Sequence, residues 1–211
     1  MSACNKDSSD VVASIAHALY RSRSLKFGSF RIKSGIYSPY YIDLSWLLSS
    51  PQDFCCVRDI VAKKIRKVVT FAGIDKLASI ELKGALLLPS IASKLNMPSV
   101  VVRKIRKQYG LTERIAGGTV VKGEKILFLD DVISDGMSKL EGIKLLEEEG
   151  AEVGYVVVVV DREQGGKDNI ERAGYRFHAL ARISELIESL LYSSHISKEQ
   201  AKTVLDYIEK S

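Results

Sequence analysis

Two adjacent carboxylates, Asp130 and Asp131, follow an apolar run at residues 126–129 and precede a short loop that contains Gly136. Residues 138–141, Ser-Lys-Leu-Glu, have the spacing of a capping box at the start of a helix. A strand, a loop and a helix in this order gather backbone N–H groups around a concavity that suits a phosphate. The two acids can hold sugar hydroxyls or a hydrated magnesium ion beside it. The stretch predicts a sugar-phosphate site, although two acids can also simply end a buried strand.

A second candidate site is the segment from Glu81 to Gly84, where an expected strand meets an expected helix. Gly84 allows a ligand to approach the backbone closely, and the start of a helix favours anions. A charged surface turn has the same appearance, so this segment gains weight only from its neighbours.

The third candidate is a basic segment, Arg103-Lys104-Ile105-Arg106-Lys107, with four cations in five residues. It leaves an expected strand and enters a polar stretch that contains glycine. This form suits a mobile lid that neutralises pyrophosphate, while a solvated charged face is the alternative.

The fourth candidate is Arg162, in a turn with two glycines directly after a valine-rich strand. The arginine offers a planar, two-pronged donor for a carboxylate, and the glycines allow a tight turn around a flat ligand. An ordinary surface turn is again the alternative.

The apolar pattern that must position these residues alternates between strands and helices. This alternation predicts a doubly wound, mostly parallel α/β sheet flanked by helices, with ligands at the carboxyl ends of the strands. The expected helices are 11–22, 51–71, 84–95, 138–149 (ended by Gly150) and 198–209 (capped by Ser197); the expected strands are 77–81, 99–103, 126–129 and 153–160, with a hairpin-like region at 25–43 and a loop or hairpin at 104–123.

The composition of the 211 residues indicates one globular domain with a full core, at 46% hydrophobic and 27% charged residues. No apolar run is long enough to span a bilayer, and the first residues lack the pattern of a secretion signal. Three cysteines, two of them adjacent, form no disulfide framework, so we expect a cytoplasmic protein. The net charge is +5, but aromatic residues do not interleave with the basic clusters, which argues against nucleic-acid binding. The three histidines show no metal-ligand spacing.

Residues 126–138 resemble the phosphoribosyl-pyrophosphate signature of the type I phosphoribosyltransferases. From about Leu19 to Ile187 the chain resembles the orotate phosphoribosyltransferases, most specifically in a hood-like region that includes Lys26 and Tyr40-Tyr41-Ile42-Asp43. We expect an N-terminal helix and hood at 1–45 and a phosphoribosyltransferase core at 46–190. The C-terminal helix of the same domain, at 191–211, adds nothing to the resemblance. The chain departs from the family pattern at Ile105, Tyr109, Asp135 and Met137.

The same resemblance implies roles for individual residues, a Mg²⁺ cofactor and a homodimer. Mg²⁺ would arrive with phosphoribosyl pyrophosphate (PRPP) and waters near the two acids, without a direct protein ligand. The loop at 103–118 would be shared between subunits. The implied catalytic residues are Arg103, Lys104, Lys107, Asp130 and Asp131; those for PRPP are Lys26, Lys83, Gly84, Ser134, Asp135, Gly136, Met137 and Ser138; those for orotate are Tyr40, Tyr41 and Arg162.

The implied reaction joins orotate to PRPP, releasing pyrophosphate and giving orotidine 5′-phosphate for pyrimidine synthesis. Two alternatives remain open. A non-catalytic PRPP-binding regulator is favoured modestly by Ile105, Tyr109 and Asp135, although it should carry a nucleic-acid-binding module. A purine-base phosphoribosyltransferase should lack the hood pattern around Lys26 and should lack Arg162.

Overall fold

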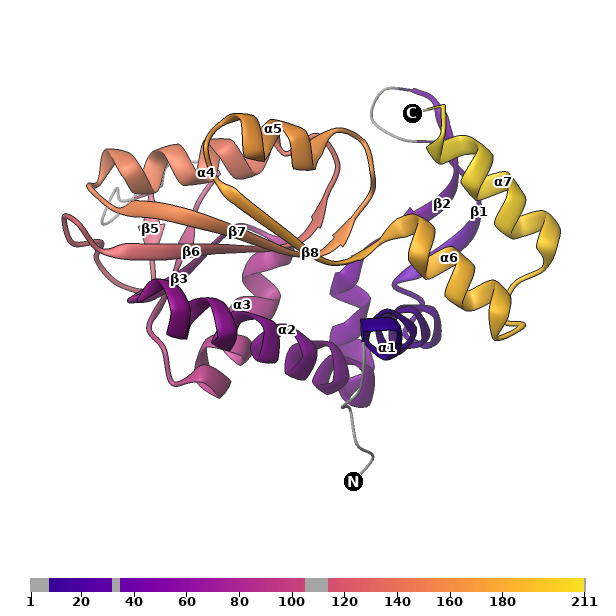
Figure 1. Ribbon diagram of the computed structural model, residues 1–211, viewed down its shortest axis with the longest axis horizontal. Coiled ribbons are helices and arrows are strands. Elements are labelled where there is room, and N and C mark those ends of the chain that lie inside the picture. The colour runs from indigo at the N-terminus through magenta and orange to yellow at the C-terminus, as the bar shows by residue number, and fades with distance from the viewer. Residues whose placement is uncertain (1–7, 32–34, 105–113, 211) are drawn as a thin grey trace.

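A six-stranded sheet lies between two layers of helices, with a separate two-stranded hairpin beside it (Figure 1). This computed structural model describes residues 8–31, 35–104 and 114–210, and side chains from Asp10 onward. No helix in these ranges is long and apolar enough to cross a membrane.

The sheet has the strand order β5-β4-β3-β6-β7-β8. Neighbouring strands are parallel except for β5, which pairs antiparallel with β4. The predicted doubly wound α/β fold is thus confirmed. The strands are β3 (Lys76–Ile80), β4 (Ser99–Val102), β5 (Ile115–Ala116), β6 (Lys125–Ile133), β7 (Glu152–Asp161) and β8 (Arg176–Arg182).

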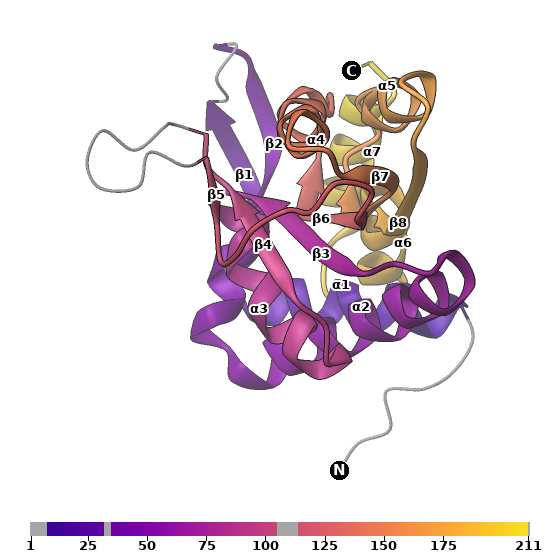
Figure 2. The ribbon, with the colours of Figure 1, turned by 90° about the vertical axis from the view of Figure 1, so that its left-hand side faces the viewer.

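Helices cover both faces of the sheet, and Figures 1 and 2 show the two layers. One apolar cluster joins α1, α2 and α3 to one face, and a second joins α4 and α5 to the other. The helices are α1 (Ser8–Arg21), α2 (Pro51–Ala72), α3 (Lys83–Leu95), α4 (Met137–Glu148), α5 (Gly166–Arg172), α6 (Ile183–Tyr192) and α7 (Lys198–Ile208).

The order of connections changes direction between β3 and β6. From β3 the chain passes through α3 to β4 on one side, and from β6 it passes through α4 to β7 on the other side. Such a switch point opens a crevice at the carboxyl ends of the two strands, where ligands bind in sheets of this type. The Glu81–Gly84 segment follows β3, and the acid pair lies near the end of β6.

β7 lies between β6 and β8 and is covered on both faces. Val156 to Val160 are all 0% exposed, which explains the continuous valine run. Its neighbour β6 extends to Ile133, four residues beyond the predicted end. Asp130 and Asp131 therefore lie inside the strand, because pairing with β7 continues as far as Ile133 and Asp161.

The predicted capping box at residues 138–141 was wrong. α4 begins at Met137 with Gly136 as its N-cap, and no side chain of an N-cap residue satisfies its first turn. Gly136 has a φ of +80°, so the chain turns into the helix one residue earlier than the serine. The predicted capping box of α7 is confirmed, with Ser197 and Gln200 bonded reciprocally. Gly150, with a φ of +95°, follows the end of α4 as expected.

The hairpin that forms the hood consists of β1 (Leu25–Arg31) and β2 (Tyr37–Ile42), which pair antiparallel as predicted. Alternation along β2 buries Ser38, Tyr40 and Ile42 and leaves Tyr37 and Tyr41 exposed. A short 3₁₀ helix, η1 (Leu44–Ser49), connects the hairpin to α2.

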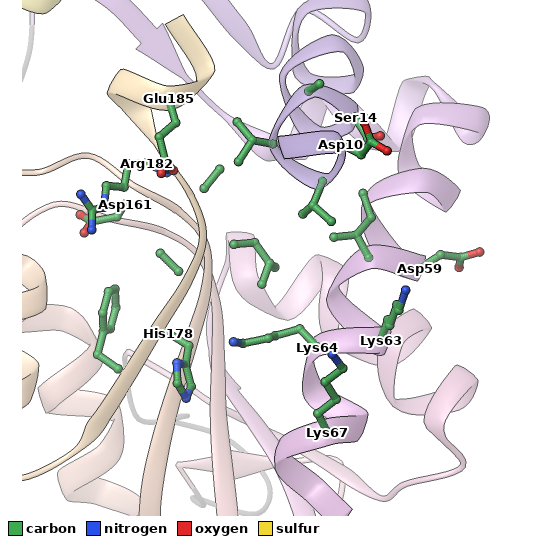
Figure 3. A pocket seen from close by; sticks show the side chains of 18 of the residues that line it. Asp10, Ser14, Asp59, Lys63, Lys64, Lys67, Asp161, His178, Arg182 and Glu185 are labelled. Carbon is green, nitrogen blue, oxygen red and sulfur yellow. The ribbon is translucent and has the colours of Figure 1, made fainter. Parts of the chain in front are cut away.

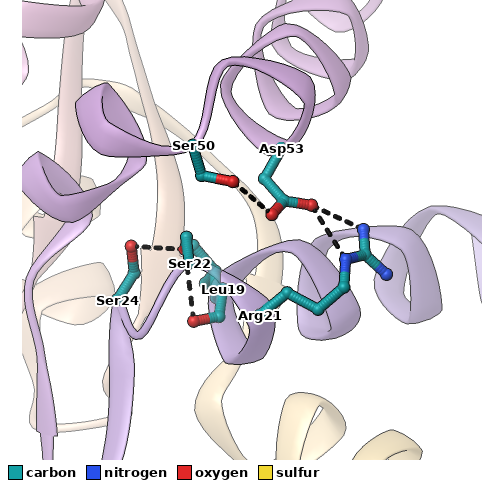
Figure 4. Close-up of polar contacts among 6 residues, drawn as sticks. All are labelled: Leu19, Arg21, Ser22, Ser24, Ser50 and Asp53. Atoms are coloured by element: carbon teal, nitrogen blue, oxygen red, sulfur yellow. Dashed lines mark hydrogen bonds and ion pairs between the residues drawn. The ribbon is translucent and has the colours of Figure 1, made fainter.

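A buried carboxylate ties α1 to the start of α2 (Figure 4). Asp53 is 5% exposed and accepts hydrogen bonds from Arg21 Nε at 3.1 Å and from Ser50 Oγ at 2.7 Å. The neighbouring Ser22 and Ser24 hydroxyls lie 2.8 Å apart where the chain turns into β1. These contacts fix the hood hairpin relative to the core.

We expect Asp53→Ala to lower the free energy of unfolding by about 1–3 kcal/mol, because it removes the shared acceptor of Arg21 and Ser50. Chemical denaturation at neutral pH measures this change. The control Glu148→Ala removes an exposed ion pair with Lys144 (3.9 Å) and should change stability by less than about 0.5 kcal/mol. Equal effects of the two substitutions would contradict a structural role for Asp53.

Candidate active site

The acid pair of β6 is buried, and its two carboxylates have different partners. Asp130 and Asp131 are 4% and 5% exposed. Asp130 Oδ2 lies 2.8 Å from the Lys139 ammonium, and its Oδ1 accepts the Asp131 backbone N–H at 3.0 Å. Asp131 Oδ2 is buried and has no hydrogen-bond donor within the described part of the chain. Asp130 is therefore held from within the fold, whereas Asp131 needs a donor from elsewhere.

This difference has an electrostatic consequence for Asp131. Burial, and then the charge of Asp130, raise the pKa of Asp131 to about 7, against the lowering effects of a backbone hydrogen bond, Lys139 and Lys83. A carboxylate in this state gains from a hydroxyl donor or a nearby cation. Ribose hydroxyls and a hydrated magnesium ion are both of this kind.

Lys139 was not among the predicted site residues. It is 8% exposed, on the face of α4 that also buries Gly142, Ile143 and Leu146. This 3- and 4-residue spacing places a lysine on the apolar face of its helix, and a buried lysine requires an acidic partner. That spacing is the signal in the sequence that could have revealed the ion pair.

Gly84 packs directly against the acid pair. A Cβ at this position would lie 2.0 Å from Asp130 Oδ1 and 2.4 Å from Ser79 Oγ. The close approach that the glycine allows is thus to the end of β3 and to the acid in β6. Gly84 therefore allows the start of α3, which follows β3, to pack closely against Asp130 of β6.

Lys83, beside Gly84, joins the hood to this region. Its ammonium lies 2.9 Å from Asp43 Oδ2 and 5.8 Å from the centroid of the Tyr41 ring. Burial alone would lower the pKa of Lys83, but the hydrogen bond and charge of Asp43 outweigh it and raise that pKa. The charge of Asp131 acts in the same direction, so Lys83 stays cationic near the open acid.

Lys26 lies against an aromatic ring of η1. Its ammonium is 3.6 Å from the centroid of the Trp46 ring, and Trp46 is 42% exposed. This cation–π contact holds a cation at the edge of the hood in the absence of an anionic ligand.

The start of the basic loop is attached to the Glu81 turn. The backbone N–H of Lys104 donates to Glu81 Oε1 at 2.6 Å. Across the base of the loop, Arg103 N donates to Arg114 O at 2.8 Å, and Arg114 Nη2 donates to Lys104 O at 2.9 Å. Lys107, Ile105 and Tyr109 lie outside the described residues. Arg103 and Lys104 are thus placed beside the turn that follows β3.

The loop from Ser134 to Ser138 presents the N-terminus of α4 to the crevice. Asp135 is exposed, and its Oδ1 accepts the backbone N–H of Met137 at 3.1 Å. Met137 itself is 60% exposed. The carboxylate of Asp135 therefore occupies one of the donors that a phosphate would use at this helix start.

Arg162 links Tyr40, in the predicted base site, to Ser134, in the loop before α4. Its Nε donates to Tyr40 Oη at 3.1 Å, and its Nη1 donates to Ser134 Oγ at 3.3 Å. Tyr40 is 1% exposed, and burial raises the pKa of its phenol against the lowering effect of Arg162. Tyr41 lies on the opposite side of β2, beside Lys83 and Phe30.

The donor set near the acid pair fits a magnesium ion that arrives with its ligand. No group of three or more His, Cys, Asp or Glu side chains that could hold a metal occurs among the described residues. Asp130 is already paired with Lys139, which leaves one open carboxylate. Mg²⁺ retains waters and binds through one or two carboxylates plus substrate phosphates, so this set is sufficient.

A cavity of about 1030 Å³ lies elsewhere, along β8 and between α1 and α2 (Figure 3). Lys64 and Lys67 of α2 line it together with His178 of β8. None of the predicted site residues is among its lining residues. The candidate active site is therefore identified by its chemistry and by its place at the switch point, and not by the size of a cavity.

The chain is similar to known phosphoribosyltransferases. Residues 46–174 match the family model described as "Phosphoribosyl transferase domain". The orotate phosphoribosyltransferase of Pyrococcus horikoshii is 36% identical over 177 residues, which cover 84% of this chain and 91% of that protein. The uridine 5′-monophosphate synthase of Bos taurus is 33% identical over 203 residues, covering 95% of this chain and 41% of that protein.

A solved structure of Leishmania donovani UMP synthase superposes with a TM-score of 0.80 at 29% identity, over 94% of this chain and 42% of that one. The chain thus spans about two fifths of these two synthases and nearly the whole of the archaeal relative. The chain belongs to the phosphoribosyltransferase family and, within it, to the orotate phosphoribosyltransferases.

Proposed function

We propose that the chain transfers the 5-phosphoribosyl group of PRPP to N1 of orotate, with release of pyrophosphate. The bond between ribose C1 and the pyrophosphate oxygen breaks, and pyrophosphate leaves with the electron pair. The new bond forms between C1 and N1 of the orotate anion, which has already lost its proton. Orotidine 5′-phosphate is the product, as pyrimidine synthesis requires.

The observation that carries this proposal is the buried acid pair beside the start of α4. Asp131 Oδ2 has no donor in the described structure, and α4 begins without a side-chain cap from its N-cap residue. A ribose 5-phosphate satisfies both, because its hydroxyls can donate to Asp131 while its phosphate accepts from the amides of residues 134–138. Asp130 is held by Lys139 and accepts the backbone N–H of Asp131, so it orients the pair. It also adds negative charge to the site.

The chemical task in this site is electrostatic. Positive charge develops on the ribose ring as the bond to pyrophosphate loosens, and the acid pair lies where it would stabilise that charge. Negative charge develops on the leaving group, and Lys26, Lys83, Arg103, Lys104 and Lys107 are the cations proposed to receive it. Magnesium bound with the pyrophosphate supplies further positive charge.

The proposed base site is formed by the hood and the turn after β7. The Arg162 guanidinium uses Nε for Tyr40 and Nη1 for Ser134, which leaves further N–H donors for the carboxylate of orotate. Tyr40 borders the proposed base site beside Arg162, whereas Tyr41 lies on the opposite side of β2, beside Lys83. This arrangement supports an acidic pyrimidine more than a purine, which carries no carboxylate.

We further propose a homodimer, in which the loop at 103–118 reaches the partner's site, and a cytoplasmic location. The resemblance to the orotate phosphoribosyltransferases supports the homodimer. The exposed thiol of Cys55 supports the cytoplasmic location, because such thiols are typical of a reducing compartment.

The test of the proposed function is the ultraviolet absorbance of orotate over time with purified protein, PRPP and Mg²⁺. We expect the absorbance to fall only when all components are present, and to stop falling with EDTA. Adenine, guanine and hypoxanthine in place of orotate should give no nucleotide product. Purine conversion without orotate conversion would assign a different base, and PRPP binding without any turnover would indicate a regulator.

Asp131→Asn should have opposite effects on activity and stability. The raised pKa of Asp131, about 7, means that the folded state retains an extra proton from about pH 4 to 7, so ionisation of wild-type Asp131 lowers stability as pH rises through this window. At pH 8 we expect the free energy of unfolding of the variant to exceed that of the wild type by a few kcal/mol (on the order of 1–4). We expect its turnover to be reduced about 100-fold or more. Denaturant unfolding at pH 5 and pH 8, alongside the orotate assay, measures both. A variant with full activity, or with no gain at pH 8 over pH 5, would refute the role of Asp131.

Asp135→Asn should improve the use of PRPP. The substitution removes a negative charge next to the proposed 5′-phosphate site while keeping an oxygen that can accept from Met137 N. We expect the KM for PRPP to fall roughly three- to tenfold at low salt, with less gain at high salt because of screening. Glu141→Gln, in α4, is a charge-matched control that should leave the KM unchanged. A higher KM for PRPP in Asp135→Asn would mean that the carboxylate supports phosphate binding.

A further inference from the structure

The C-terminal helix α7 lies along the hood hairpin, well away from the sheet (Figure 1). It buries Ala201 and Val204, each 1% exposed. Leu205, Tyr207 and Ile208 are partly buried against the same apolar cluster that contains Tyr40. The helix therefore covers the hood side of the proposed base site.

A polar cluster holds the turn before α7 against α1. The Ser193 hydroxyl lies 3.0 Å from His17 Nε2 and 2.9 Å from His195 Nδ1, and it donates to Ser189 O at 2.8 Å. Because the serine proton is used for Ser189, both imidazoles act as donors to its oxygen. Their rings also lie 4.8 Å apart. The start of α7 is thus fixed to α1. The rest of the helix packs against the hood hairpin.

A chain of contacts leads from α7 to the phosphate loop. The ring of Tyr207 meets the ring of Tyr40 edge to face, with centroids 6.2 Å apart and an interplanar angle of 81°. Tyr40 Oη accepts from Arg162 Nε at 3.1 Å, and the Arg162 guanidinium carbon lies 5.2 Å from the Tyr40 ring centroid. Arg162 Nη1 then reaches Ser134 Oγ at 3.3 Å. Tyr40 is held from one side by Arg162 and from another by Tyr207.

We propose that α7 is a working part of the base site, with Tyr207 as a positioning residue that fixes Tyr40 and, through it, Arg162. This inference rests on the proposed function, in which Arg162 binds the orotate carboxylate. Without the Tyr207 ring, space opens beside Tyr40, so its phenol can turn away from Arg162. The guanidinium then loses one of the two contacts that orient it. Binding of orotate should weaken, while binding of PRPP should change little, because Arg162 touches the proposed PRPP site only through Ser134.

The test compares Tyr207→Leu, which removes the ring, with Tyr207→Phe, which keeps it. The matched control is Tyr192→Leu, since Tyr192 of α6 is 94% exposed, and Arg162→Ala is the positive control. The free energy lost with an edge-to-face aromatic pair is large enough that the KM for orotate should rise about two- to tenfold in Tyr207→Leu. The KM for PRPP should stay within about twofold in Tyr207→Leu. Tyr207→Phe keeps the ring against Tyr40, so its KM for orotate should rise less than in Tyr207→Leu, and Tyr192→Leu should match wild type.

A second readout does not depend on activity. Tyr40, at 1% exposure, should resist nitration by tetranitromethane in the wild type and in Tyr207→Phe, and should be nitrated in Tyr207→Leu, as located by mass spectrometry. An unchanged orotate KM in Tyr207→Leu, or an equal rise in both KM values, would overturn the proposal. If the wild type does not convert orotate at all, the proposed function fails, and protection of Tyr40 in Tyr207→Leu would then overturn the contact itself.

Discussion

The buried ion pair between Lys139 and Asp130 is the interaction on which the rest of the site depends. Two adjacent carboxylates at 4% and 5% exposure would repel each other strongly in a closed interior, and a buried cation is the remedy. Lys139 lies on the buried face of α4, so the helix that follows the loop at residues 134–136 also pairs with the first acid. Within the described residues, Asp131 Oδ2 has no donor. The fold thus maintains one buried carboxylate oxygen without a partner at the switch point, where we propose that a ribose hydroxyl donates to it.

The hood adds specificity to this common arrangement through a second set of contacts. Tyr40 and Arg162 are far apart in the sequence, yet they meet over the carboxyl end of β7. Arg162 also contacts Ser134, in the loop before α4. On the other side of β2, Lys83 is paired with Asp43 and lies near Tyr41. These contacts hold the Lys83 ammonium beside the hood hairpin. The proposed base site and the proposed pyrophosphate site therefore share the hairpin of β1 and β2. One face of β2 lies toward each site.

Most of the fold could be predicted from the sequence because its strands are continuous apolar runs and its long helices have clear apolar faces. Prediction failed where the signal was local or mixed. β6 continues through two acids, which interrupt the apolar pattern although Ile133 is fully buried. α5 has seven residues, and β8 has a run of half-buried positions without alternation, so neither stands out. Within the site, the acid pair, Gly84 and Arg162 were predicted from residue type and spacing, with their roles implied by family resemblance, and the structure places Gly84 against Asp130. Lys139, Asp43, Trp46 and Tyr207 were missed, since their importance lies in contacts between segments far apart in the sequence.

The most direct test of this account is a crystal structure of the protein with PRPP and Mg²⁺. The account predicts that a ribose hydroxyl lies within hydrogen-bond distance of Asp131, that the phosphate accepts from amides of residues 134–138, and that Lys139 still contacts Asp130. A ribose bound through Asp130, with Lys139 displaced and Asp131 without contact to the ligand, would contradict it.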